Sequence, residues 1–201
     1  MAVSKTQIVN LALSHLHENG TLDNVDTENT TAAVNGRLWW EPARQQALVD
    51  MDLGFARKRL SLAVHAIDPP ADWTYRYQFP ADCIQPRYLE NPAGRGLPPI
   101  PFLVEQASDG TRSILTNLGT TACLVYTRDA DDPAFFYPHF TLALSYLLAH
   151  YLAGPITGKK VLKREMMENY MLAIGTAGSA EANVTAAGTE GSPDPDWIKN
   201  R

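Results

Sequence analysis

Cysteine is scarce in this chain of 201 residues, which contains only Cys83 and Cys123. The two cysteines are far apart in the sequence and form neither a Cys-x-x-Cys pair nor a disulfide framework. We therefore expect both to be small, buried, apolar residues, not metal ligands or disulfide partners.

Long hydrophobic runs are also missing. The most apolar stretch, residues 140–154, is too short to cross a bilayer and contains Ser145 and His150. The first residues lack a basic region followed by a continuous apolar core and a small-residue cleavage site, so they predict no secretory signal. We expect a chain that is made in the cytoplasm and does not associate with a membrane.

An excess of positive charge is absent, because 17 basic residues stand against 22 acidic ones and give a net charge of -5. This balance argues against a protein that holds nucleic acid tightly on a basic face. It does not exclude a protein that lets DNA pass. With 45% apolar residues, the chain can bury a sizeable core, and its length favours one domain with appendages.

The sequence lacks the common catalytic motifs: G-x-S-x-G, a phosphate-binding loop, a dinucleotide fingerprint and H-E-x-x-H. Cys83 has no histidine close in sequence to activate it, and its Pro-Ala-Asp-Cys context is interpreted as a turn that returns to the core. A histidine close in space stays possible. We therefore predict no enzymatic activity and no cofactor, with a small hydrolase using Asp129, Asp131 or Cys83 as an alternative.

Metal sites are not predicted either. His15 and His17 lie on different sides of a helix, and His139 and His150 are too far apart to share an ion. The acidic run Asp129, Asp131 and Asp132 lacks the spacing of a calcium loop, so capping is the preferred interpretation.

Apolar residues at helical spacing predict helices near residues 4–18, 28–52, 134–153 and 158–175. Ser4 and Gln7 form a capping box, and Pro42 predicts a kink or two abutting helices. Gly154 and Pro155 are expected to end the third helix, which is apolar on nearly every side and predicts a core helix.

Between the helices, period-two aromatics from Trp73 to Phe79 predict a strand. Residues 102–106, 112–117 and 122–128 are further strand candidates, the last two joined by a hairpin at Leu118-Gly119. The predicted fold is therefore α+β and mainly α. Helices from both chain ends form a bundle, and a β-rich insert of about 73–128 forms a small antiparallel lobe.

Two segments are candidates for docking a partner. The triplet Arg57, Lys58 and Arg59 predicts a solvated basic face. From residue 179 to 201 the chain is small and polar, too poor in apolar surface to fold alone, but it carries Trp197 and Ile198 near its end. We predict an adaptor domain at 1–178 and a flexible docking tail at 179–201, whose aromatic anchor fills a partner pocket.

Five segments in order resemble the tail tubular protein A, or head-to-tail adaptor, family of short-tailed bacteriophages. They read SKTQIVNLALSHL, LWWEPARQQALVDMDLGFARKRLSLA, YRYQFPADC, ILTNLGTTACLVYTRDADDPAFFYPHFTLALSYLLAHYLAGPITG and DWIKNR. The resemblance covers nearly the whole chain. The family often has a tryptophan-asparagine pair before Phe55-Ala56, where this chain has Leu53-Gly54.

The resemblance implies a structural subunit of the virion head-tail junction, assembled in the host cytoplasm. Such a subunit docks beneath the portal protein as a twelve-fold ring, extends the DNA channel and offers a platform for the tail nozzle, which is tail tubular protein B-like. Genomic DNA would pass without specific binding, in keeping with the acidic composition. A head-completion connector of a long-tailed phage is a second alternative, since it shares the helical plan.

Overall fold

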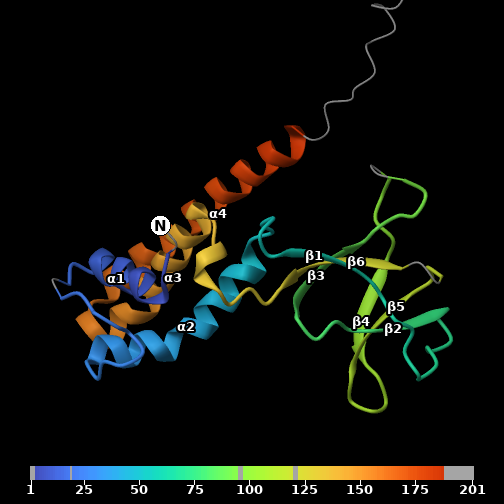
Figure 1. The fold of residues 1–201 in the computed structure, drawn as a ribbon, viewed down its shortest axis with the longest axis horizontal. Coiled ribbons are helices and arrows are strands. Elements are labelled where there is room, and N and C mark those ends of the chain that lie inside the picture. Colours follow the sequence, from blue (N-terminus) through green and yellow to red (C-terminus); the bar gives the residue numbers. More distant parts are fainter. Residues whose placement is uncertain (1–2, 19, 95–96, 120–121, 188–201) are drawn as a thin grey trace, which may run out of the picture.

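The computed structural model describes residues 3–18, 20–94, 97–119 and 122–187. Within them lie four α-helices and two small antiparallel sheets, with 44% helix and 19% strand, so the predicted mainly helical α+β class is confirmed. The helices gather in one lobe and the strands in another (Figure 1). The β lobe is inserted between α2 and α3.

The two N-terminal helices, α1 (Lys5–His15) and α2 (Thr31–Asp50), form largely as predicted. The Ser4 and Gln7 capping box is present at the start of α1. α2 starts at the N-cap Thr30 and continues through Pro42 as one helix. The buried face of α2 includes Ala33, Gly36, Trp40, Ala43 and Ala47, which recur at helical spacing in the sequence.

The third predicted helix is divided. A short 3-10 turn, η1 (Pro133–Phe135), is followed by α3 (Pro138–Thr157), which starts at a proline. The predicted end at Gly154-Pro155 is wrong, because α3 continues through Pro155 to the C-cap Gly158. Gly158 has φ 66°, the left-handed conformation that glycine adopts without a steric penalty.

α4 (Lys160–Ala187) covers the predicted helix near 158–175 and buries Met166 and Tyr170, which lie one turn apart. It continues beyond the predicted end at residue 175, so residues 179–187 are helical and do not belong to a flexible tail. Alanine-rich sequence favours helix even where little surface is buried. The C-terminal part of α4 projects away from the bundle (Figure 1). The remainder of the predicted tail, 188–201, lies outside the described residues.

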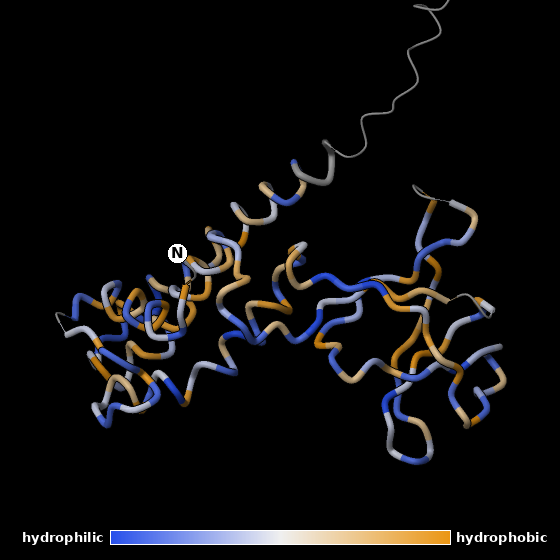
Figure 2. Tube along the Cα trace, in the orientation of Figure 1, coloured by the Kyte–Doolittle hydropathy of each residue, from blue (hydrophilic) through white to orange (hydrophobic). Residues whose placement is uncertain are grey.

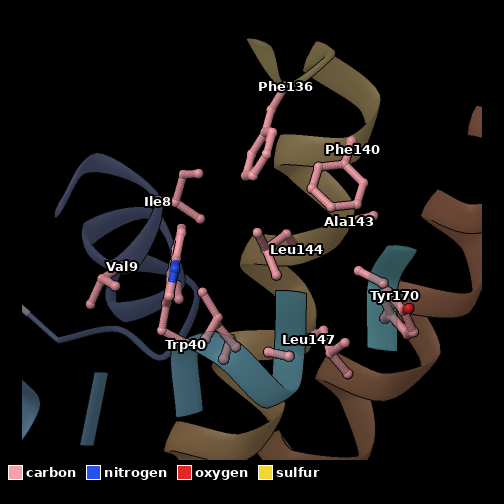
Figure 3. Close-up of a cluster of buried hydrophobic side chains, with 14 of the residues drawn as sticks. Ile8, Val9, Trp40, Phe136, Phe140, Ala143, Leu144, Leu147 and Tyr170 are labelled. Atoms are coloured by element: carbon pink, nitrogen blue, oxygen red, sulfur yellow. The ribbon is translucent and has the colours of Figure 1, made fainter. Parts of the chain in front are cut away.

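α3 is the central helix of the bundle and packs against the other three. Figure 3 shows Trp40 of α2 beside Ile8 of α1, with Leu144 and Leu147 of α3 close by and Tyr170 on α4. Ile8, Leu144 and Tyr170 are each at most 1% exposed. Burial of such side chains contributes ~1.5–3 kcal/mol each, which makes this cluster the main stabilising feature of the helical lobe.

The β lobe has six described strands in two sheets. They are β1 (Arg57–Ser61), β2 (Tyr75–Gln78), β3 (Cys83–Leu89), β4 (Phe102–Gln106), β5 (Arg112–Thr116) and β6 (Cys123–Arg128). One sheet has the order β1-β6-β3 and the other β2-β5-β4. The predicted hairpin between β5 and β6 is therefore wrong, because these strands lie in different sheets. β5 pairs instead with β4 across a turn at Gly110, which has φ 82°.

Two isolated antiparallel bridges connect the sheets, Val64 with Tyr77 and Leu89 with Ile100. The chain after β1 thus pairs with β2, and the chain before β4 pairs with β3, so the strands close into a barrel-like lobe. Tyr77 is fully buried in its core, and Tyr75 and Phe79 pack against that core. The strand predicted from these aromatics is present as β2, although Trp73 precedes it and Phe79 follows it.

β1 and β3 were not predicted as strands, so the β lobe begins before residue 73. β1 begins hydrophilic (Figure 2) because its first three residues are cations, and four of its five residues are exposed. β3 contains Pro86, and its pairing with β6 shifts register on both sides of Gln85 and Pro86. Such irregularities accommodate a residue that cannot donate a ladder hydrogen bond.

An aromatic cluster lies where the chain enters and leaves the β lobe. Phe55, just before β1, has its ring 5.1 Å from the rings of Tyr137 and Phe140 and 5.6 Å from that of Phe136. Offset and edge contacts of this kind stabilise beyond the burial of area. The cluster therefore packs the segment that leads from α2 into β1 against the N-terminus of α3.

Candidate docking surfaces

The basic triplet is the candidate surface that the structure describes. Arg57, Lys58 and Arg59 are consecutive residues of β1, at the edge of its sheet next to α2 (Figure 1). Because side chains alternate along a strand, Lys58 points to the opposite side from Arg57 and Arg59. Their side chains are 26%, 46% and 53% exposed in sequence order.

Each cation of the triplet has an acidic partner within the protein. Arg57 Nε lies 3.0 Å from Asp52 Oδ1, and its Nη1 lies 3.7 Å from Glu181 Oε1 of α4. Lys58 Nζ is 2.8 Å from Asp82 Oδ2, and Arg59 Nε is 3.0 Å from Glu90 Oε1. The triplet is thus neutralised locally, which weakens its field toward an anionic partner such as DNA.

Lys58, Asp82 and Tyr126 form one network. The Tyr126 hydroxyl donates to Asp82 Oδ1 at 2.8 Å, and the ammonium of Lys58 contacts the other carboxylate oxygen. The hydrogen bond to Asp82 raises the pKa of Lys58. Partial burial opposes ionisation of Asp82, but its bonds to Lys58 and Tyr126 outweigh that effect and lower its pKa. The network therefore keeps both charges at neutral pH.

Arg44 links the two lobes and was not singled out by sequence reasoning. Its guanidinium is 2% exposed, donates to the carbonyl of Ala130 at 2.6 Å and forms ion pairs with Glu41 and Asp129. Asp129 therefore serves as the partner of a buried cation. The sequence feature that could have pointed to Arg44 is its position one turn after Trp40, on the buried face of α2.

The acidic run around Asp129 does not form a metal centre. Asp132 caps η1 by accepting a hydrogen bond from the Ala134 amide at 2.9 Å, as the capping interpretation predicted. Across the described part of the chain, no group of three or more His, Cys, Asp and Glu side chains is placed to hold a metal ion.

Neither cysteine has the surroundings of a nucleophile. Cys83 is buried and free, and burial raises the pKa of its thiol to about 12. Cys123 is half-buried, and burial followed by its hydrogen bond to Glu90 raises its pKa as well. A thiol with a raised pKa is almost entirely protonated at neutral pH and reacts slowly.

The histidines act as structural side chains where their contacts are described. His15 Nε2 lies 3.0 Å from Ser145 Oγ, and its ring stacks on Tyr146 with centroids 4.3 Å apart. His150 Nδ1 lies 2.8 Å from the carbonyl of Lys163, which connects α3 to α4.

The second predicted docking element, Trp197 and Ile198, lies outside the described residues. The apolar run at 140–154 was expected to be too short to cross a bilayer, but α3 extends it to 20 residues and is long and apolar enough by length and composition. Of the apolar window of α3, 56% is buried inside the protein. The core helix of a folded bundle has the same properties.

No protein-family model matches the chain, and no curated protein matches it.

Proposed function

We propose that this protein is a structural head-to-tail adaptor of a short-tailed phage. In this proposal twelve copies form a ring beneath the portal protein, extend the DNA channel and provide the platform for the tail nozzle. The protein acts at the head-tail junction of the virion, after assembly in the host cytoplasm, and performs no catalysis.

The observation that carries the proposal is how the resembling segments are used in the fold. The first four form α1, the α2-to-β1 crossover, β2, and the continuous path from β5 to the end of α3. They supply α1, most of α2, α3 and both connections between the helical lobe and the β lobe, whereas α4 lies outside them. The resemblance thus lies in the framework of the protein and not in isolated surface loops.

The distribution of charge supports a channel subunit. The β-lobe segment, residues 57–128, has eight basic and six acidic residues, whereas the rest of the chain has nine basic and sixteen acidic residues. The negative charge therefore belongs mainly to the helical part. A surface of that sign does not retain phosphates by counterion release, so DNA can slide past it.

The chemistry at Cys83 and Asp129 favours an adaptor over a hydrolase. Cys83 is a buried thiol with a raised pKa, and Asp129 is paired with the buried Arg44. A nucleophile needs an accessible, activated atom, and a general base needs a free lone pair near substrate. Cys83 offers no such atom, and one carboxylate oxygen of Asp129, Oδ1, is committed to the buried Arg44.

The test is co-sedimentation with the portal protein encoded in the same phage genome. The adaptor proposal predicts a largely monomeric free chain that joins portal rings, because docking supplies contacts that free subunits lack. A stable dimer that is indifferent to portal would overturn it.

A further inference from the structure

An open apolar groove lies on the helical lobe between α1 and the beginning of α3. Its volume is about 450 Å³, and it is lined by Val3, Gln7, Asn10, Leu11, Ser14 and Thr141. Its exposed walls are almost entirely apolar. Leu11 leaves 41% of its surface exposed there, although it lies beside the main core of the bundle. This volume lies in the range of small-ligand sites and can hold one large side chain with a smaller neighbour.

Three polar residues of the groove already have their hydrogen bonds. Gln7 Oε1 accepts from the Ser4 amide at 2.9 Å, and Ser14 Oγ donates to the Leu11 carbonyl at 2.7 Å. Asn10 donates from Nδ2 to the Leu22 carbonyl and accepts at Oδ1 from the Leu22 amide, each at 2.9 Å. None of the three therefore needs a ligand.

Thr141 differs from these three residues. It is 7% exposed, and its Oγ1 is buried without a hydrogen-bond partner among the described residues. Buried hydroxyl groups are nearly always hydrogen-bonded, because an unpaired one loses its water without replacement. An apolar groove with one unpaired hydroxyl is complementary to an apolar group that carries a single polar atom.

The indole of tryptophan has that chemistry, since it is a large apolar ring with one N–H donor and no acceptor. The chain has four tryptophans, of which Trp39 stacks on Tyr151, Trp40 is in the bundle core and Trp73 is in the β lobe. The fourth, Trp197, is followed by Ile198. A strongly polar stretch, GTEGSPDPD, separates this apolar pair from the end of α4.

We infer that the α1–α3 groove of one copy binds Trp197 and Ile198 of a second copy, with the Trp197 indole donating to Thr141 Oγ1. The ten residues from Ala187 to Trp197 span at most about 35 Å when extended. The C-terminal part of α4, which ends at Ala187, projects away from α1 and from the groove beside it (Figure 1).

A contact from the tail of one copy to the groove of the next is heterologous, and such contacts generate rings when the rotation closes. The inference therefore deepens the proposed ring and rests on the self-association that the ring requires. Its test needs no portal protein, so the two proposals can fail separately.

The experiment measures binding of a fluorescein-labelled peptide, residues 188–201, to the full-length chain carrying Trp197→Ala. This substitution removes the competing anchor of the chain itself. Fluorescence anisotropy should show saturable binding, weakened at least about tenfold when the peptide carries Trp197→Ala. No binding, or equal binding of both peptides, would overturn the inference.

Substitutions in the groove locate the peptide. Thr141→Val keeps the shape but removes the hydroxyl, so it should weaken binding about fivefold to tenfold, while Thr141→Ser should retain it. Leu11→Ser should weaken binding as well. The matched control is Leu172→Ser on α4, where the leucine is 72% exposed and binding should not change. Unaltered binding to both Thr141→Val and Leu11→Ser would place the peptide elsewhere and contradict the inference.

Binding of the peptide to the unsubstituted chain distinguishes docking between two copies from docking of a tail in its own groove. With docking between copies, a dilute solution of the unsubstituted chain binds the labelled peptide as tightly as the Trp197→Ala chain does. If its own tail filled the groove, the labelled peptide would be excluded even at high dilution, and docking between copies would be wrong.

Discussion

Arg87 Nη2 of β3 lies 2.9 Å from the carbonyl oxygen of Met51, at the C-terminal end of α2. The same nitrogen also reaches the carbonyls of Leu48 at 2.9 Å and Val49 at 3.1 Å. The last carbonyls of a helix lack partners within the helix, and a cation there also opposes the negative end of its dipole. A side chain of the β lobe therefore caps a helix of the other lobe and holds the two together.

Arg87→Met should lower the free energy of unfolding by ~2–3 kcal/mol, because it removes charged hydrogen bonds and leaves partly buried carbonyls unpaired. Urea unfolding followed by circular dichroism measures the loss. Arg164→Met is the control, since that side chain is 76% exposed and its loss should cost less than about 0.5 kcal/mol. Equal effects of the two substitutions would show that Arg87 does not cap α2.

Two glycines at the end of α3 should respond oppositely to alanine. Gly154 lies within the helix with open space around it, so Gly154→Ala should stabilise by ~0.5–1 kcal/mol. Gly158 also has open space but adopts φ 66°, so Gly158→Ala should destabilise by ~1 kcal/mol. Thermal unfolding of the two variants decides the matter. A stabilising Gly158→Ala would mean that the helix does not end in a left-handed residue.

His15 should make the fold less stable in mild acid. Ser145 Oγ donates its proton to the Leu142 carbonyl, so the imidazole of His15 donates to Ser145 from Nε2. Burial lowers the pKa of His15 below the ordinary value of 6.5. Between the lowered pKa and pH 6.5, His15 is protonated to a greater extent in the unfolded chain than in the folded one. The free energy of unfolding is therefore highest above pH 6.5 and decreases as the pH falls from 6.5 toward the lowered pKa.

Urea unfolding between pH 7.5 and pH 5 measures this dependence, and an NMR titration of the His15 ring gives the pKa directly. His15→Gln should reduce the loss of stability in acid, whereas the same change at the exposed His139 should not. A His15 pKa at or above 6.5 would contradict the burial argument.

Cys83 should resist thiol reagents in the folded protein. At pH 8 a thiol with a pKa of about 12 has a negligible thiolate fraction, and burial blocks access to it. With a disulfide reagent, Cys123 should react first and Cys83 only as the chain unfolds. The single variants Cys83→Ala and Cys123→Ala assign the two rates. Rapid labelling of Cys83 in the native state would restore the hydrolase alternative.

Local signals predicted much of the helical lobe. The Ser4 and Gln7 capping box, the buried face through Trp40 and the apolar α3 all follow from residues near in sequence. The C-terminal ends of α3 and α4 were not predicted correctly from the sequence. Pro155 costs the helix a hydrogen bond without ending it, since packing of the surrounding helix outweighs that loss.

Strand pairing was harder to predict, because pairing depends on contacts distant in sequence. The Asp109-Gly110 pair is the stronger hairpin signal and forms the turn between β4 and β5, whereas Leu118-Gly119 connects the two sheets. β1 escaped notice because three consecutive cations hide any alternation. Their partners Asp82, Glu90 and Glu181 are brought close only by the fold.

The sequence pointed to only some of the residues that form the docking surfaces and the contacts between the lobes. The basic triplet was recognisable as a charge run, but its neutralisation by acidic partners was not. Arg44, Arg87 and Thr141 carry no motif, because their roles arise from burial and from neighbours on other elements.

The most direct test of the adaptor proposal is the mass that each portal ring gains when the protein binds. Mass photometry of purified portal rings, with and without an excess of the chain, measures this gain. The proposal predicts one saturating step equal to twelve subunits of 22.1 kDa each. No gain in mass, or a gain that does not correspond to a closed ring of subunits, would contradict it.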